Sequence, residues 1–277
     1  MGENLDTKTV EGFGEEWSRF DQTGMESDEL SEQFERYFAV FPWDELPKNA
    51  IGFDLGCGSG RWASKVAERV GELHCIDASR DALAVAKRNL SDKENVEFHH
   101  ASVDDIPLAD DSMDFGYSLG VLHHIPDTAD GIKACVNKLK SGAPFLVYLY
   151  YAFDNRPTWF RTAWKISDVF RSFISSFPFG LKKTVTDLIA VLIYFPLAKM
   201  SLVLEKLGFA VNVLPLSTYR HHSFYTMRTD SLDRFGTRLE HRFTKTQIEE
   251  MLTNAGLETI RFSDGTPYWC AVGFRKH

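Results

Sequence analysis

The stretch Asp54-Leu-Gly-Cys-Gly-Ser-Gly60 decides the fold of this chain. It follows a short apolar run, Ile51 to Leu55, and precedes a stripe of apolar residues at helical spacing that begins at Trp62. The run predicts a buried strand, and glycines at its end let the backbone approach a ligand without a Cβ in the way. The following helix adds free N–H groups and positive potential at its first turn. We therefore expect a nucleotide-binding turn here.

Strand and helix patterns alternate outward from this turn. Further strands are expected at Glu72–Ile76, Val96–His99, Met113–Leu119 and Pro144–Tyr150, and two more at Leu257–Phe262 and Tyr268–Phe274. Ser79 and Asp127 are expected as helix N-caps, and Thr244 to Gln247 as a capping box. These patterns predict an α/β fold: a Rossmann-like, doubly wound, mostly parallel seven-stranded sheet with a helical insertion after the fifth strand.

Composition and charge narrow the function classes. The chain has 31 basic and 39 acidic residues, and its net charge of −8 argues against a general polyanion binder. Between Tyr151 and Lys245, however, we count 14 basic and 7 acidic residues, which makes the insertion basic. The four scattered cysteines predict reduced thiols, and the polar start predicts no signal peptide, so we expect a cytoplasmic protein.

Asp77 is the second element of the nucleotide site. It lies 21 residues after Gly56 at the end of the second expected strand, where a carboxylate can accept hydrogen bonds from both ribose hydroxyls. Gly56, Gly58 and Gly60 give G-x-G-x-G, whereas the dinucleotide fingerprint G-x-G-x-x-G requires glycine where this chain has Arg61. The spacing therefore disfavours a nicotinamide oxidoreductase.

In these residues the chain resembles the class I S-adenosylmethionine-dependent methyltransferases, particularly their type 11 small-molecule group. The resemblance covers residues 50–150 well and residues 244–276 in architecture. It implies an enzyme that uses S-adenosyl-L-methionine and releases S-adenosyl-L-homocysteine. It also implies three regions: an N-terminal helical segment over the cofactor (1–48), the methyltransferase core (49–150 and 244–277) and an inserted helical cap that binds the acceptor (151–243).

The resemblance also implies cofactor-binding residues. Residues 54–60 would hold the methionine part, residues 77 and 78 the ribose, and residues 101–104 the adenine, although this chain has Ser102 where relatives usually carry Asp. Trp17 or Phe13 would wall off the cofactor and Arg19 would meet its carboxylate; the alternative for this segment is a hydrophobic anchor. The full expected set is Trp17, Arg19, Asp54, Gly56, Cys57, Gly58, Gly60, Asp77, Ala78, Ser102, Val103, Asp104 and Leu119.

His123 and His124 are the candidate catalytic residues, since they follow the fourth strand on the loop that faces the methyl group in the resembling family. An imidazole suits a general base for an oxygen acceptor. The alternative is that one histidine orders the turn before Pro126. Three histidine doublets occur, but adjacent strand residues face opposite sides of a sheet and chelate poorly, so we expect no metal.

The insertion supplies the acceptor candidates. Tyr150 and Tyr151 end the fifth strand, and Arg220, His221 and His222 are basic candidates for an anionic acceptor, with core packing and paired surface charges as the alternatives. The apolar run Leu188 to Ala198 contains Pro196 and is expected to be too short to span a bilayer. Residues 187–208 would either contact a membrane surface or pack as a cap helix.

The sequence thus favours a methyltransferase that acts on a small or lipid-linked, anionic acceptor, with oxygen as the favoured target atom. Two other functions stay open: methylation of RNA or nucleosides, and S-adenosylmethionine binding without catalysis. The oligomeric state is not predicted.

Overall fold

The computed structural model describes residues 4–19, 27–212 and 214–277. The chain divides into two compact units. Within the described residues, the first unit contains residues 4–19, 30–154 and 239–277, and we call it the sheet unit. The second contains residues 27–29 and the described part of 155–238, and we call it the helical unit.

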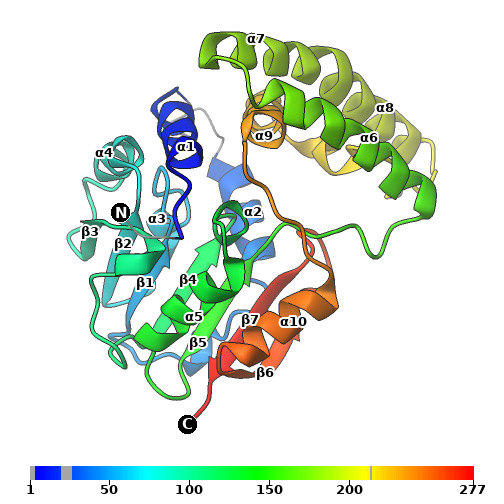
Figure 1. Cartoon of the computed structure of the whole chain (residues 1–277). Helices are drawn as coiled ribbons and strands as arrows, with labels where there is room; N and C mark the ends of the chain where they lie inside the picture. The colour runs from blue at the N-terminus through cyan, green and yellow to red at the C-terminus, as the bar shows by residue number, and fades with distance from the viewer. Residues whose placement is uncertain (1–3, 20–26, 213) are drawn as a thin grey trace. The chain divides into compact units, whose positions relative to one another are not determined.

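A seven-stranded sheet forms the centre of the sheet unit (Figure 1). Its strands have the order β3-β2-β1-β4-β5-β7-β6, and all pair in parallel except β7, which is antiparallel to both β5 and β6. The predicted α/β, Rossmann-like sheet is therefore confirmed. The strands are β1 (Ile51–Leu55), β2 (Glu72–Asp77), β3 (Val96–His100), β4 (Phe115–Leu119), β5 (Pro144–Tyr148), β6 (Leu257–Phe262) and β7 (Cys270–Arg275).

Helices of the sheet unit begin where the sequence predicts caps. Ser79 accepts a hydrogen bond from Ala82 N, Asp127 accepts one from Asp130 N, and Thr244 forms the full capping box with Gln247. These three predictions are confirmed. The helices outside the insertion are α1 (Thr7–Arg19), α2 (Ser27–Tyr37), α3 (Ala63–Val66), α4 (Arg80–Asn89), α5 (Thr128–Lys138) and α10 (Lys245–Asn254), with short turns η1 (Trp43–Glu45), η2 (Val103–Asp105) and η3 (Leu122–His124).

Glycine and phenylalanine interlock at the centre of the sheet. In the register of β1 and β4, Gly52 lies opposite Phe115 and Phe53 lies opposite Gly116. A Cβ on Gly52 would lie 2.3 Å from the Phe115 ring, and one on Gly116 would lie 2.4 Å from the Phe53 ring. Phe53 and Phe115 belong to two different apolar clusters. Because neighbouring strand residues face opposite sides, each ring fills the space above the other strand's glycine on its own face.

One predicted helix is shorter than expected. The apolar stripe from Trp62 to Val70 predicts a helix, but α3 covers only Ala63–Val66. Gly71 N and Glu72 N both donate to Ala50 O, which draws the chain into β2 directly after the turn. The tertiary requirement to start β2 beside β1 therefore ends the helix before its apolar pattern ends.

The helical unit contains α6 (Thr158–Ile174), α7 (Phe179–Ile189), a π-helical turn η4 (Ala190–Tyr194), α8 (Phe195–Lys206), η5 (Ser217–His221) and α9 (Phe224–Gly236). The expectation that the apolar stretch around Pro196 is too short to span a bilayer is wrong as far as length and composition go. One apolar helix runs from Phe179 to Lys206, and its length and composition would suffice to cross a membrane. Phe195 N donates to Ala190 O, five residues back, and this wider turn removes the carbonyl clash that Pro196 would cause in a regular helix.

We predict that Gly116→Ala lowers the free energy of unfolding by about 1–3 kcal/mol, since the new methyl group overpacks against the Phe53 ring. Urea denaturation followed by circular dichroism measures the change. Gly180→Ala is the matched control, because a Cβ there meets nothing within 4 Å. Equal stability of both variants would contradict the interlock.

Candidate functional site

The glycine turn is fastened to the tip of β2. Gly56 N and Cys57 N both donate to Ile76 O, at 2.7 and 3.1 Å, and Gly58 N donates to Asp77 Oδ2 at 2.9 Å. The turn therefore lies at the carboxyl ends of β1 and β2, where open α/β sheets bind ligands.

The turn requires glycine for both conformation and space. Gly56, Gly58 and Gly60 have φ values of 78°, 54° and 80°, in the left-handed region that favours glycine. A Cβ on Gly56 would lie 2.4 Å from the Val121 side chain, and one on Gly58 would lie 3.1 Å from Trp17 Nε1. The backbone is therefore closely covered from two sides, by α1 and by the loop after β4.

Asp54 is fully buried and Asp77 is half-buried, and their carboxyl groups have different surroundings. Asp77 accepts from Ser79 N through Oδ1 at 2.8 Å and from Gly58 N through Oδ2 at 2.9 Å; burial raises its pKa, and these two bonds oppose the rise. Asp54 is 1% exposed, its Oδ2 has no hydrogen-bond partner among the described residues, and burial raises its pKa to about 8. Asp77 thus organises the turn, whereas Asp54 is a largely desolvated acid beneath it.

A cavity opens above the turn. It is lined by the residues that follow β1, β2, β3 and β4, and by one face of α1. Counted with its open mouth, it encloses about 950 Å³ of space. All of its lining residues belong to the sheet unit.

The cavity brings together most of the predicted cofactor residues. Those that line it are Trp17, Gly56, Cys57, Gly58, Asp77, Ala78, Ser102, Val103 and Leu119. Asp54 and Gly60 lie outside the lining, and Asp104 instead accepts a hydrogen bond from Asn4 N at 3.0 Å. Arg19 is the last residue of α1, and its side chain lies outside the described part of the structure.

The two candidate catalytic histidines occupy different positions. His124 lines the cavity, and its Nδ1 donates to Leu239 O at 2.7 Å. His123 is fully buried and does not line the cavity; its ring stacks on Tyr150 with 3.9 Å between the ring centroids. Burial, followed by the charges of His124, Arg242 and His241, lowers the pKa of His123 well below its usual value. His123 is therefore a neutral, packed ring.

The tyrosines expected at the acceptor site pack against aromatic and basic neighbours. The Tyr150 ring stacks on His123 and also contacts the Arg242 guanidinium, whose carbon lies 4.8 Å from the centroid of the tyrosine ring. Tyr151 packs against Phe153, Tyr268 and Trp269. Neither tyrosine lines the cavity.

Two of the three basic acceptor candidates of the insertion, Arg220 and His221, are engaged by one acid of the same unit. Arg220 Nη2 lies 2.8 Å from Glu205 Oε1, and His221 Nε2 lies 3.0 Å from the other oxygen of that carboxylate. The His222 ring packs edge-on against Tyr219. Two further arginines of the insertion also form ion pairs with acids: Arg228 pairs with Asp187, and Arg234 pairs with Asp168.

Sequence reasoning missed one wall of the cavity. Leu5, Thr9 and Val10 line it together with Phe13 and Trp17. Val10, Phe13 and Trp17 recur at spacings of three and four, so the apolar face of α1 was readable from the sequence. The polar residues between these positions make the segment look hydrophilic as a whole, so the apolar face is seen only when the helical spacing is considered.

Comparisons with known proteins concern mainly this part of the chain. Residues 53–147 match the protein family described as a methyltransferase domain. Over 101 residues the chain is 27% identical to a demethylmenaquinone methyltransferase of Bacillus licheniformis, a match that covers 35% of this chain and 43% of that protein. Over 91 residues it is 34% identical to a ubiquinone biosynthesis O-methyltransferase of Alkalilimnicola ehrlichii, covering 32% and 37% respectively. The chain thus spans less than half the length of these relatives.

Solved structures show the same fold over nearly the whole chain. A SAM-dependent methyltransferase from Thermotoga maritima superposes with a TM-score of 0.52 at 12% identity, and covers 97% of this chain and 100% of its own. The family match, the sheet order and the glycine turn beside Asp77 agree with one another. Residues 53–147 of this chain therefore match a methyltransferase domain in sequence, and the chain has a fold that is also found in a methyltransferase of known structure.

Proposed function

We propose that this chain transfers the methyl group of S-adenosyl-L-methionine to a hydroxyl oxygen of a small or lipid-linked, anionic acceptor. The observation that carries the proposal is the cavity at the carboxyl ends of β1 to β4, with the glycine turn and Asp77 on one side and α1 on the other.

The residues of the cavity fit this cofactor. The Asp77 carboxylate suits a ribose diol, because each of its oxygens has accepting capacity beyond its one backbone bond. Phe13, Trp17 and Val103 offer apolar walls for a nucleoside and exclude water from the site. When bound, the cofactor supplies an electrophilic methyl group on a sulfonium, whose sulfur leaves readily as a neutral thioether. The protein then has to align the acceptor and keep the site dry.

His124 is our choice for the base. Since Leu239 O can only accept, His124 Nδ1 carries a proton, and the neutral ring therefore has no proton on Nε2. Nε2 can accept the proton of an acceptor hydroxyl as the new C–O bond forms. His123 supports the position of this ring, with 4.0 Å between the two centroids.

We propose that the insertion contributes to acceptor binding. Its two ends meet in the sheet unit: Phe243 N donates to Tyr150 O, and Ala152 N donates to Phe243 O. His241 N donates to His123 O, so the returning chain contacts the loop that carries both histidines. Residues 155–238 hold 12 basic and 5 acidic residues, and this excess supports an anionic acceptor.

We predict that Asp77→Ala weakens S-adenosyl-L-methionine binding about a hundredfold or more, because hydrogen bonds to charged groups contribute about 1.5–3 kcal/mol each. Isothermal titration calorimetry measures the affinity. Asp105→Ala removes an exposed carboxylate that does not line the cavity, and is expected to bind like the unmodified chain. A melting curve for each variant shows whether the fold is kept. Unchanged affinity in a folded Asp77→Ala protein would refute the site.

We predict that His124→Asn slows methyl transfer about a hundredfold, the lower end of what a general base contributes. The asparagine amide keeps a donor near the position of Nδ1 for Leu239 O but removes the base. The readout is incorporation of radiolabelled methyl from the cofactor into an extract of the native host, with the cofactor affinity measured in parallel.

His123→Phe is the matched variant, since it keeps an aromatic ring against Tyr150. We expect it to retain transfer within a few fold. If His123→Phe abolishes transfer and His124→Asn does not, the assignment of the base is wrong. If the unmodified chain binds the cofactor but labels nothing in the extract, a binding protein without catalysis is favoured instead.

A further inference from the structure

The outer side of α6 exposes large apolar residues in one stripe. Ile166, Val169, Phe170 and Phe173 recur at spacings of three and four, which places them on one face of the helix. Val169 is 71% exposed and Phe173 is 66% exposed. In a soluble monomer such residues normally occur singly, so a full stripe points to a surface that is covered in function.

The long helix from Phe179 to Lys206 carries a second stripe. Leu188, Leu192, Phe195 and Val203 are all exposed, Leu192 to 69%. The most apolar 18-residue window of this helix has a mean hydropathy of 1.9, yet only 22% of it is buried. The helical unit therefore exposes apolar residues on both of its longest helices.

The opposite side of the long helix is packed within the helical unit. Arg228 Nε lies 3.0 Å from Asp187 Oδ1, and Ser231 Oγ donates to Thr186 O at 2.9 Å, which joins α7 to α9. Figure 1 shows α9 running beside α6 and α7 within this unit. A helix that is fixed on one side by an ion pair and apolar on the other suits a position in the plane of a membrane surface, not across it.

We propose that α6 and the helix from Phe179 to Lys206 form a membrane-docking surface that binds a bilayer containing anionic lipids. Charge supports this partner over a second copy of the chain. Arg161 and Lys165 lie on α6, and Lys199 and Lys206 lie on α8, so basic residues accompany both apolar stripes. Long basic side chains beside apolar ones are typical of helices that lie at the headgroup level. The proposal does not depend on the chemistry assigned to the cavity.

The test is flotation of the full chain with two kinds of vesicle, phosphatidylcholine alone and an anionic mixture of about two parts phosphatidylcholine to one part phosphatidylglycerol, because anionic headgroups attract basic side chains at the membrane surface. We expect the chain to float with the anionic vesicles and Leu192→Glu or Val169→Glu to reduce the bound fraction at least about fivefold. Asn254→Glu adds the same charge to an exposed position of the sheet unit and is expected to bind normally.

Two results would overturn the membrane proposal. One is that the unmodified chain stays unbound with both vesicle types. The other is that light scattering shows a dimer that Leu192→Glu converts to a monomer, while vesicle binding is the same in all variants. Cofactor affinity is measured on each variant, because its loss reports on the methyltransferase site and not on this surface.

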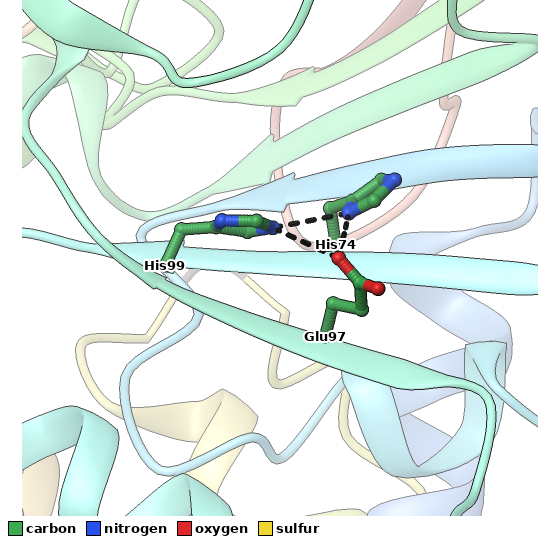
Figure 2. A group of neighbouring side chains, drawn as sticks. All are labelled: His74, Glu97 and His99. Carbon is green, nitrogen blue, oxygen red and sulfur yellow. Dashed lines mark hydrogen bonds and ion pairs between the residues drawn. The ribbon is translucent and has the colours of Figure 1, made fainter.

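A second, independent observation concerns three side chains on one face of β2 and β3, away from the cavity lining. His74 lies opposite Glu97 in the parallel register, and His99 is two residues further along β3. Figure 2 shows the His99 ring and the Glu97 carboxylate pointing toward His74. His74 Nδ1 lies 3.0 Å from His99 Nε2 and 3.5 Å from Glu97 Oε2, and the last two atoms are 3.8 Å apart.

These separations match a metal site. A circle through three atoms at those distances has a radius of about 2.0 Å, which equals a zinc–nitrogen or zinc–oxygen bond. Glu72 Oε1 lies 3.4 Å from His74 Nε2, the other ring nitrogen, as an outer carboxylate does in many zinc sites. The expectation of no metal considered only adjacent histidines; here the neighbouring strand supplies the second imidazole.

We infer that His74, Glu97 and His99 bind one divalent transition-metal ion, with zinc as the best match to two imidazoles and one carboxylate. Titration with cobalt(II), followed by its visible absorption, uses the metal alone as probe. We expect one equivalent to bind, and His99→Ala or Glu97→Gln to weaken binding about tenfold or more. His277→Ala removes an imidazole outside the cluster and is the control. Equal cobalt binding by all four proteins, or none by the unmodified chain at millimolar metal, would overturn the site.

Discussion

The carboxylate of Asp77 holds together the part of the molecule that forms the candidate site. One oxygen accepts from Gly58 N and the other from Ser79 N, so the tip of β2 fixes both the glycine turn and the start of α4. Because the same turn follows β1, the bonds align the carboxyl ends of two neighbouring strands. The cavity lies between these aligned strand ends and α1.

Much of the fold follows from local signals in the sequence. Strand runs and caps at Ser79, Asp127 and Thr244 are local features, and their physical causes act within a few residues. The exceptions are settled by distant contacts. The helix after Trp62 ends early because Ala50 O holds the chain at Gly71, and the helix through Pro196 continues because a π turn removes the clash. Neither contact can be read from hydrophobic periodicity.

The candidate site likewise has parts that the sequence predicts and parts that depend on tertiary contacts. The spacing of the glycine turn and Asp77 predicts a nucleotide site, and both line the same cavity. Which of the two adjacent histidines faces the cavity is determined by tertiary contacts. His124 bonds to Leu239 O, more than a hundred residues later in the chain, and His123 packs against Tyr150, more than twenty residues later. The charge excess of the insertion was visible, but its pairing was not, since Asp168, Asp187 and Glu205 meet their arginines only in the folded unit.

The bridge between Tyr151 and Phe243 has a consequence for how such a protein can change. The segment between these residues leaves and re-enters the sheet at one point, so its length and content are not constrained by the strands on either side. If the segment binds the acceptor, as proposed, exchange of it as a single cassette would alter what the protein recognises while leaving the cavity of the sheet unit intact. Replacement of this segment by another of different length requires only that the bridge between Tyr151 and Phe243 still forms.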